Sequence, residues 1–317
     1  MKPSFSFNDA LSAPFAMLKR RPLYLFVWGL MMVALMAVMY AIMIPAFAAL
    51  RFDQAGEPAF MDQYIVEMSR FSAAINGMNV LMYLGMLVLW TAAGRSTLSP
   101  GRGDRFLFLR LGMDEVRVAV TFVAVFVGWY IALIVLALIG VALALALWPS
   151  GEATAVGVVM VYGLIVFLGS IWALVRVSLI APATLILKRF AFSEGWALAR
   201  GQVWKLIGLN LVVWLIYMVG LILLYAVVGG ILAAGFFGQG LAWPSEVETV
   251  ADLEPLFRSM IAPLAITALP VALGYGWIMA LYAAPQIIAA RQLLDGNPAP
   301  APIVEDAPPA DTLQPVP

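Results

Sequence analysis

Cysteine and histidine are both absent from this 317-residue chain. Without cysteine there is no disulfide, no thiolate nucleophile, and no thiolate ligand for zinc or an iron–sulfur cluster. Without histidine the chain lacks the commonest general base and the commonest metal ligand. We therefore predict no catalytic residues, no metal site and no cofactor, and we expect that the protein is not an enzyme.

Charged residues are also scarce: they make up 11% of the chain, whereas 64% of its residues are hydrophobic. Ordinary soluble domains have about 45–50% apolar and about 25% charged residues. The formal net charge is zero, so the chain has no overall attraction to nucleic acid. So much apolar surface needs lipid as its solvent, and the composition therefore indicates a membrane protein.

Six long apolar runs predict an all-α membrane protein with six transmembrane helices. Each run exceeds the ~18 residues that a spanning helix needs. None contains Asp or Glu, which disfavours a proton relay within the membrane. A signal peptide is the competing interpretation of the first run, but that run is nearly double the usual ~7–15 apolar residues. The predicted spans are 22–50, 71–94, 118–148, 153–187, 206–241 and 260–290.

The basic residues predict the orientation. With a cytoplasmic N-terminus, all but three of the 18 Lys and Arg residues fall on the cytoplasmic side, the exceptions being Arg51, Arg70 and Arg258. This asymmetry is what the positive-inside rule expects, and it places both termini in the cytoplasm. The chain then divides into an interfacial amphipathic segment (1–21), a transmembrane domain (22–295) and a proline-rich tail (296–317). We expect the tail to be disordered and inert, with a proline-binding partner as the alternative.

A short pattern recurs ahead of the spans. A shift of 185 positions places Phe7–Leu11 on Phe192–Trp196, and both segments read as short amphipathic helices followed by a span. Ser6 and Asp9 give the first one a start that resembles a capping box. Residues 105–115 have similar ingredients before the third span. The pattern predicts three helix hairpins, each preceded by an interfacial segment; a true repeat and a coincidence of basic and aromatic anchors both explain it.

Two stretches carry a resemblance to a known family. They are residues 5–26 (FSFNDALSAPFAMLKRRPLYLF) and residues 176–182 followed by residues 192–208, with the motif FSEGWALARGQVWKLIG. Together they resemble the membrane domain of some bacterial glycerophosphodiester phosphodiesterases and related stand-alone membrane proteins of unknown function. The catalytic barrel of those enzymes, with its metal-binding His and Glu residues, is absent, so no catalytic role carries over. The resemblance implies a bacterial inner-membrane protein.

Basic residues near the cytoplasmic interface are the candidate contacts for anionic lipid. Arg176 stands out because it interrupts an apolar stretch. It would bind a lipid headgroup or a substrate phosphate, or simply extend its side chain to the interface, which we favour since it lies about 34 Å from Ala153 along a helix. The candidate lipid contacts are Arg20, Arg21, Arg176, Lys188, Arg189, Arg200 and Lys205.

The sixth span is rich in proline and glycine, which indicates either a broken helix or, as we favour, a kinked packing helix. Transporters bind substrates at such breaks, although a kinked packing helix is the simpler interpretation. The candidate broken-helix site comprises Pro263, Pro270, Gly274 and Gly276. Asn76, Asn79 and Asn210 would line a solute path or, as we favour, form hydrogen bonds between helices. Gly157, Gly163 and Gly169 predict close helix contact.

Two functions from different classes follow. The first is a non-catalytic membrane protein that organises anionic lipid or a partner protein with its basic cytoplasmic segments. The alternative is a transporter or permease for a small or lipidic solute, built around the broken sixth helix. The sequence predicts a lipid bilayer as the principal partner and no nucleic acid; it leaves open a protein partner and a homo-oligomer.

Overall fold

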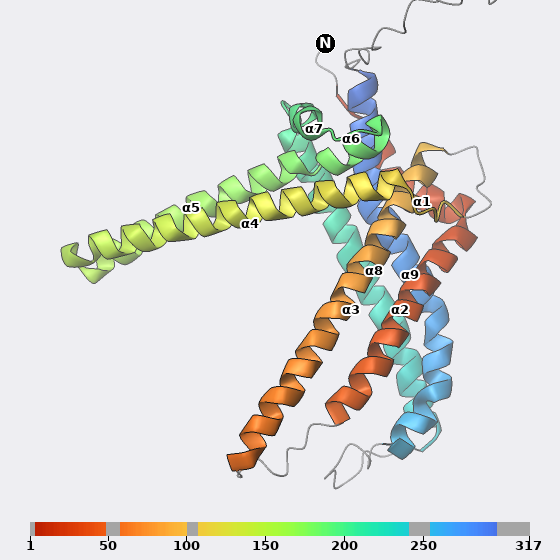
Figure 1. Cartoon of the computed structure of the whole chain (residues 1–317). Coiled ribbons are helices and arrows are strands. Elements are labelled where there is room, and N and C mark those ends of the chain that lie inside the picture. The colour runs from red at the N-terminus through yellow and green to blue at the C-terminus, as the bar shows by residue number, and fades with distance from the viewer. Residues whose placement is uncertain (1–3, 49–57, 100–106, 241–253, 297–317) are drawn as a thin grey trace, which may run out of the picture.

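The computed structural model describes residues 4–48, 58–99, 107–240 and 254–296. These residues form helices and connecting turns, with no strand among them (Figure 1). Six of the helical stretches are long and apolar enough to cross a membrane. The chain is therefore an all-α, multi-pass membrane protein, as predicted. The helices are α1 (Phe7–Arg20), α2 (Pro22–Ala48), α3 (Pro58–Leu98), α4 (Met113–Leu147), α5 (Glu152–Val177), α6 (Ile180–Leu187), α7 (Phe192–Leu198), α8 (Val203–Gly238) and α9 (Glu254–Asp295), with a 3₁₀ turn, η1 (Trp148–Ser150), between α4 and α5.

Helix α9 is the centre of a bundle, where it contacts α1, α2, α3 and α8. Small residues allow the closest crossing. A Cβ on Gly29 of α2 would lie 1.5 Å from the carbonyl oxygen of Ala272, and a Cβ on Gly276 would lie 1.8 Å from that of Leu25. Helices in lipid associate through such close van der Waals packing, because lipid removes the hydrophobic drive between them. Gly29 of α2 and Gly276 of α9 thus fix the α2–α9 contact.

Helices α4 and α5 form a long hairpin that extends away from the bundle at a steep angle (Figure 1). Its two helices contact each other along their length, and the hydroxyl of Tyr162 donates to the Leu136 carbonyl across the pair (2.7 Å). Beyond Thr121 no residue of α4 is buried. The hairpin is therefore attached to the bundle mainly through its base.

The helix ends differ from the predicted spans in an informative way. The fourth span divides, since α5 ends at Val177 and α6 begins at Ile180 in a new direction (Figure 1). Arg70 and Arg258 were assigned to outer loops, but they lie within α3 and α9, because both helices extend past their apolar windows. Arg51 and the tail beyond Gly296 lie outside the described residues.

The segments ahead of the three hairpins are not alike. α1 and α7 both begin at the phenylalanines that the 185-residue shift superposes, and Ser6 caps α1 by accepting from the Asp9 amide (3.3 Å). The segment ahead of the second hairpin, α4–α5, is different: residues 107–112 are not helical, and Leu107 and Phe108 have positive φ. An interfacial helix therefore precedes the first and third hairpins only. Whether these segments form a true repeat stays a prediction.

Candidate functional site

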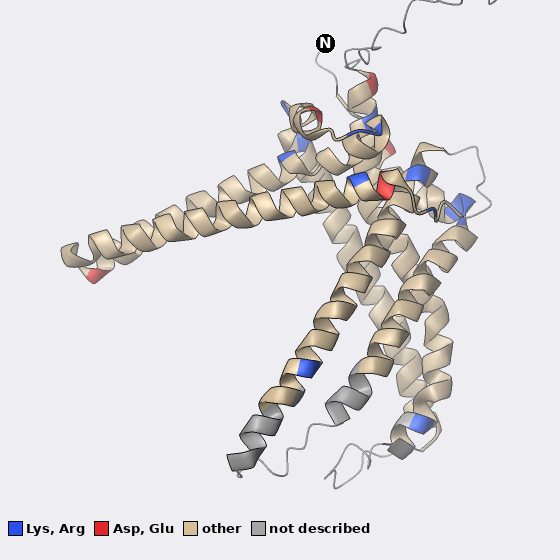
Figure 2. Cartoon of the chain, viewed as in Figure 1, with Lys and Arg blue, Asp and Glu red and all other residues tan. Residues whose placement is uncertain are grey.

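Lys and Arg residues gather at the end of the molecule that holds α1, α6 and α7 (Figure 2). We call this end the basic end. It contains all seven of the predicted lipid contacts, and the structure separates them by their partners. Three are held by the protein itself, namely Arg21, Arg176 and Arg189. Four have exposed side chains that form no hydrogen bond or ion pair with any described residue: Arg20, Lys188, Arg200 and Lys205. We call these four the free basic set.

Arg21 joins the start of α2 to the end of α3. One guanidinium nitrogen donates to the backbone carbonyl (3.2 Å) and hydroxyl (2.7 Å) of Ser96, and the other donates to the Ser99 carbonyl (2.8 Å). Its carbon lies 5.3 Å from the ring centre of Phe108 and 5.5 Å from that of Tyr24. These cation–π contacts and hydrogen bonds commit the side chain to tertiary structure.

Arg176 lies between two indole rings at the corner where α5 meets α7. Its guanidinium carbon is 4.4 Å from the ring centre of Trp196 and 5.0 Å from that of Trp172, and Nη2 donates to the Trp196 carbonyl (3.3 Å). The two indoles meet edge to face at 5.9 Å. Arg176 therefore holds α7 against the end of α5, a packing role that accounts for its charge in an apolar stretch.

The turn around α7 exposes aromatic and basic side chains together. Lys188 ends α6 in the left-handed conformation, and Phe190 and Phe192 stack on each other at 6.2 Å while both remain exposed. Trp204, beside Lys205 at the start of α8, is 85% exposed. Exposed aromatic and basic residues at helix ends are typical of the membrane–water interface. Lys188 and Lys205 therefore lie beside exposed aromatic side chains at helix ends.

A charge cluster at the base of α4 was missed by the sequence analysis. Glu115 is buried and forms an ion pair with Arg95 of α3, which also contacts Asp114 (3.5 Å). Glu115 accepts from the Gly112 amide (2.8 Å), while Arg95 donates to the Phe108 and Arg110 carbonyls. The Asp114-Glu115 pair, among arginines in an apolar chain, was the available signal. The cluster attaches the hairpin to the bundle.

The predicted broken-helix site is not a break. α9 is continuous from Glu254 to Asp295, with Pro263 and Pro270 inside it. Pro263 packs against Gly235 of α8, and Gly274 faces Leu224 of α8. Neighbouring helices compensate for the backbone groups that proline leaves unpaired. α9 is therefore an unbroken helix in which these positions pack against α8 and α2, and a substrate site at this level stays a prediction.

The other predicted polar and glycine positions have different outcomes. Asn210 of α8 accepts from Gln286 of α9 (3.3 Å), so its predicted hydrogen bond between helices is confirmed. Asn76 and Asn79 are exposed, and Asn76 bonds only to Ser72 of its own helix. Gly157, Gly163 and Gly169 have open space where a Cβ would stand, so the predicted close contact there is wrong.

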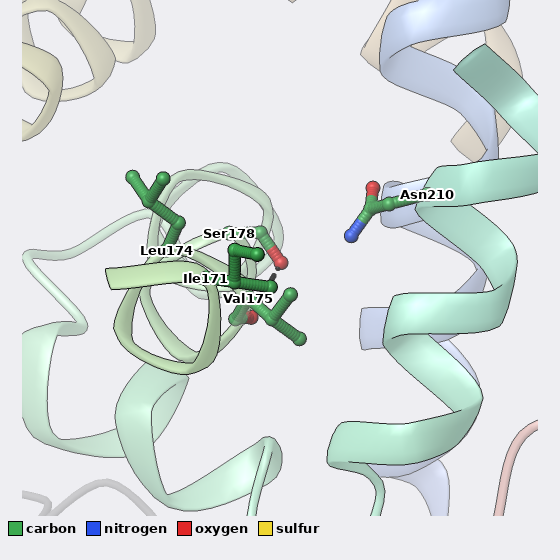
Figure 3. Close-up of a pocket in the computed structure, with 5 residues that line it drawn as sticks. All are labelled: Ile171, Leu174, Val175, Ser178 and Asn210. Atoms are coloured by element: carbon green, nitrogen blue, oxygen red, sulfur yellow. Dashed lines mark hydrogen bonds between the residues drawn. The ribbon is translucent and has the colours of Figure 1, made fainter. Parts of the chain in front are cut away.

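A small cleft lies between α5 and α8 (Figure 3). Its volume is about 280 Å³, and it is lined by Ile171, Leu174, Val175, Ser178 and Asn210. Apart from Ser178 and Asn210 the lining is aliphatic. The cleft contains no carboxylate or cation, and the described residues contain no group of acidic side chains that could hold a metal ion. Its chemistry suits an apolar molecule with a hydrogen-bond acceptor.

No family model, curated protein or solved structure matches this chain. The geometry of the basic end and of the α5–α8 cleft is therefore what bears on function.

Proposed function

We propose that this is a non-catalytic protein of the bacterial inner membrane that binds and organises anionic lipid on its cytoplasmic side. The free basic set is the observation that supports the proposal, because its four cationic side chains lie at one end of the molecule without a partner among the described residues. A Lys or Arg near the surface of an anionic leaflet contributes about 1 kcal/mol of attraction.

The orientation belongs to the same proposal. α1 and the end of α9 both lie at the basic end, and Gln292 of α9 accepts from the Ser6 amide (2.6 Å). The two described chain ends are therefore on one side of the bundle. By the positive-inside rule that side is cytoplasmic. The resemblance to the phosphodiesterase membrane domain stays a prediction, as does transport of a solute, which no longer has a broken helix to support it.

Replacement of the free basic set by glutamine tests the proposal. The full chain carrying R20Q, K188Q, R200Q and K205Q would be inserted in bilayer discs with equal amounts of an anionic and a zwitterionic phospholipid that share the same acyl chains. Native mass spectrometry then gives the ratio of the two lipids retained. We expect the parent to favour the anionic lipid, and each substitution to lower that preference about two- to fivefold at low salt.

The matched control exchanges the same cations while keeping their charge: R20K, K188R, R200K and K205R. This variant should retain the anionic preference of the parent, because the proposed attraction depends on charge. Equal retention of anionic and zwitterionic lipid by the parent would refute lipid organisation through these residues. A second protein released from the native membrane in stoichiometric amount would instead favour the organisation of a protein partner.

A further inference from the structure

The cleft between α5 and α8 contains an unused hydrogen-bond donor. The Asn210 carbonyl oxygen accepts from Gln286, but its amide nitrogen has no partner among the described residues. Figure 3 shows this nitrogen directed toward the α5 side chains. The Ser178 hydroxyl donates to the Val175 carbonyl of its own helix (2.8 Å). Any molecule in the cleft therefore meets one free amide donor and aliphatic walls.

An unpaired amide facing lipid is costly, since hydrocarbon offers it no acceptor. The occupant that removes this cost must combine a hydrogen-bond acceptor with an apolar chain. The cleft is open to the outside of the protein, and Leu174 in its lining is 46% exposed. Its volume of about 280 Å³ lies just below the usual range of ligand pockets, about 300–1,000 Å³. It has room for part of one chain, and not for a whole lipid.

The depth of Asn210 identifies the acceptor. It is seven residues beyond Val203, where α8 begins among the exposed Trp204 and Lys205, so it lies about 10 Å along the helix axis. The headgroup layer on each side of a bilayer is about 5–8 Å thick. Asn210 therefore lies near the boundary of the hydrocarbon, which is the level at which the ester groups of a glycerophospholipid join its chains.

We propose that this cleft binds one ester-linked acyl chain of a bilayer glycerophospholipid, with Asn210 Nδ2 donating to the ester carbonyl. Ile171, Leu174 and Val175 contact the methylene groups below the ester. The cleft recognises the linkage of the lipid, whereas the free basic set attracts the charge of its headgroup. The inference therefore stands on a different observation from the proposed function, and either can fail alone.

A comparison of ester with ether lipid tests this inference. The full chain would be placed in discs of two phosphatidylcholines with the same headgroup and chain length, one diester and one diether, which lacks the carbonyl. Native mass spectrometry gives the ratio retained. One hydrogen bond in an apolar setting predicts about fivefold preference for the diester lipid. N210L should reduce the ratio to one, while N79L, a substitution at an exposed asparagine of α3, should leave it unchanged.

A second variant keeps the test informative if N210L is poorly folded. L174W fills the cleft from its exposed side and should also abolish the preference for the ester. Equal retention of the two lipids by the parent would overturn the inference and indicate that water or a bare chain fills the cleft. A preference that persists in both N210L and L174W would place ester recognition elsewhere. The four-glutamine variant should keep its preference for the ester, which separates this result from the fate of the headgroup proposal.

Discussion

The bundle around α9 and the α4–α5 hairpin both consist of long apolar helices, but these helices are buried to very different extents. Helices α4 and α5 are more hydrophobic than α9 by mean hydropathy, yet beyond Thr121 no residue of α4 is buried. α9 is less hydrophobic, but 39% of its most apolar window is buried. Apolar side chains that face lipid gain nothing from burial in protein, so hydropathy does not predict packing here. Close packing depends instead on small residues that face the backbone of another helix, as at the α2–α9 crossing.

Glycine has a different structural role in the bundle and in the hairpin. In the bundle, Gly29 and Gly276 lie where a Cβ would overlap a backbone carbonyl of the facing helix. In the hairpin, Gly157, Gly163 and Gly169 face open space. The same residue type is thus a requirement of close packing in one region and replaceable in the other.

The largest expected effect is at the α2–α9 crossing. G276L would force a side chain onto the Leu25 backbone, which cannot move aside without separating the helices. Overpacking of this kind costs about 3 kcal/mol or more. G163L on α5 is the matched control and should change stability by less than about 0.5 kcal/mol. Unfolding free energies measured by steric trapping in bicelles would show the difference; similar losses in both variants would mean that the hairpin is as tightly packed as the bundle.

The sequence was sufficient for the six helices, because a long apolar run has few other structures in lipid. The sequence did not predict helix packing where that packing depends on residues of another helix. Nothing local distinguishes Gly276, which packs, from Gly163, which does not, and proline in α9 looked like a break because the helices that compensate for it were unknown. Among the candidate lipid contacts, residue type could not separate Arg21, which bonds to Ser96, from Arg20, which is exposed.

The attachment of the hairpin gives the second prediction. E115Q removes the buried carboxylate that pairs with Arg95 and caps the Gly112 amide. Loss of one partner of a buried ion pair costs several kcal/mol, but Arg95 retains Asp114 and two backbone carbonyls. We therefore expect a loss of about 1–2 kcal/mol, with faster amide exchange at the start of α4 and none of this change in α9.

R291Q is the control for that charge cluster. Arg291 forms an exposed i,i+4 pair with Asp295 at 3.8 Å, which contributes at most about 0.5 kcal/mol. If E115Q changed exchange in α9 as much as in α4, the hairpin base and the bundle would have to be treated as one cooperative unit, and the contrast between the two regions would be lost.

The smallest effect concerns pH at α7. The pKa of Glu194 is lowered below its ordinary value of about 4.5, first by the hydrogen bond from a backbone amide, then by the Ser193 hydroxyl, with a further contribution from Arg189. A carboxylate whose pKa is lower in the folded state stabilises the fold above the unfolded pKa, and this contribution is lost as pH falls through the folded value. Stability of the α7 corner should therefore decline below about pH 4.5.

E194Q isolates this term, because glutamine keeps the shape but cannot ionise. The difference in unfolding midpoint between parent and E194Q should be constant from pH 7 to pH 5 and should shrink as pH falls below 4.5. It should be small throughout, because a solvent-accessible ion pair such as Glu194 with Arg189 (3.0 Å) contributes about 0.5 kcal/mol. Trp196 in the same helix stacks against Arg176, so its fluorescence reports the corner directly. If the parent instead gained stability relative to E194Q as the pH fell, the Glu194 carboxylate would destabilise α7. The corner would then depend on the Arg176–indole contacts alone.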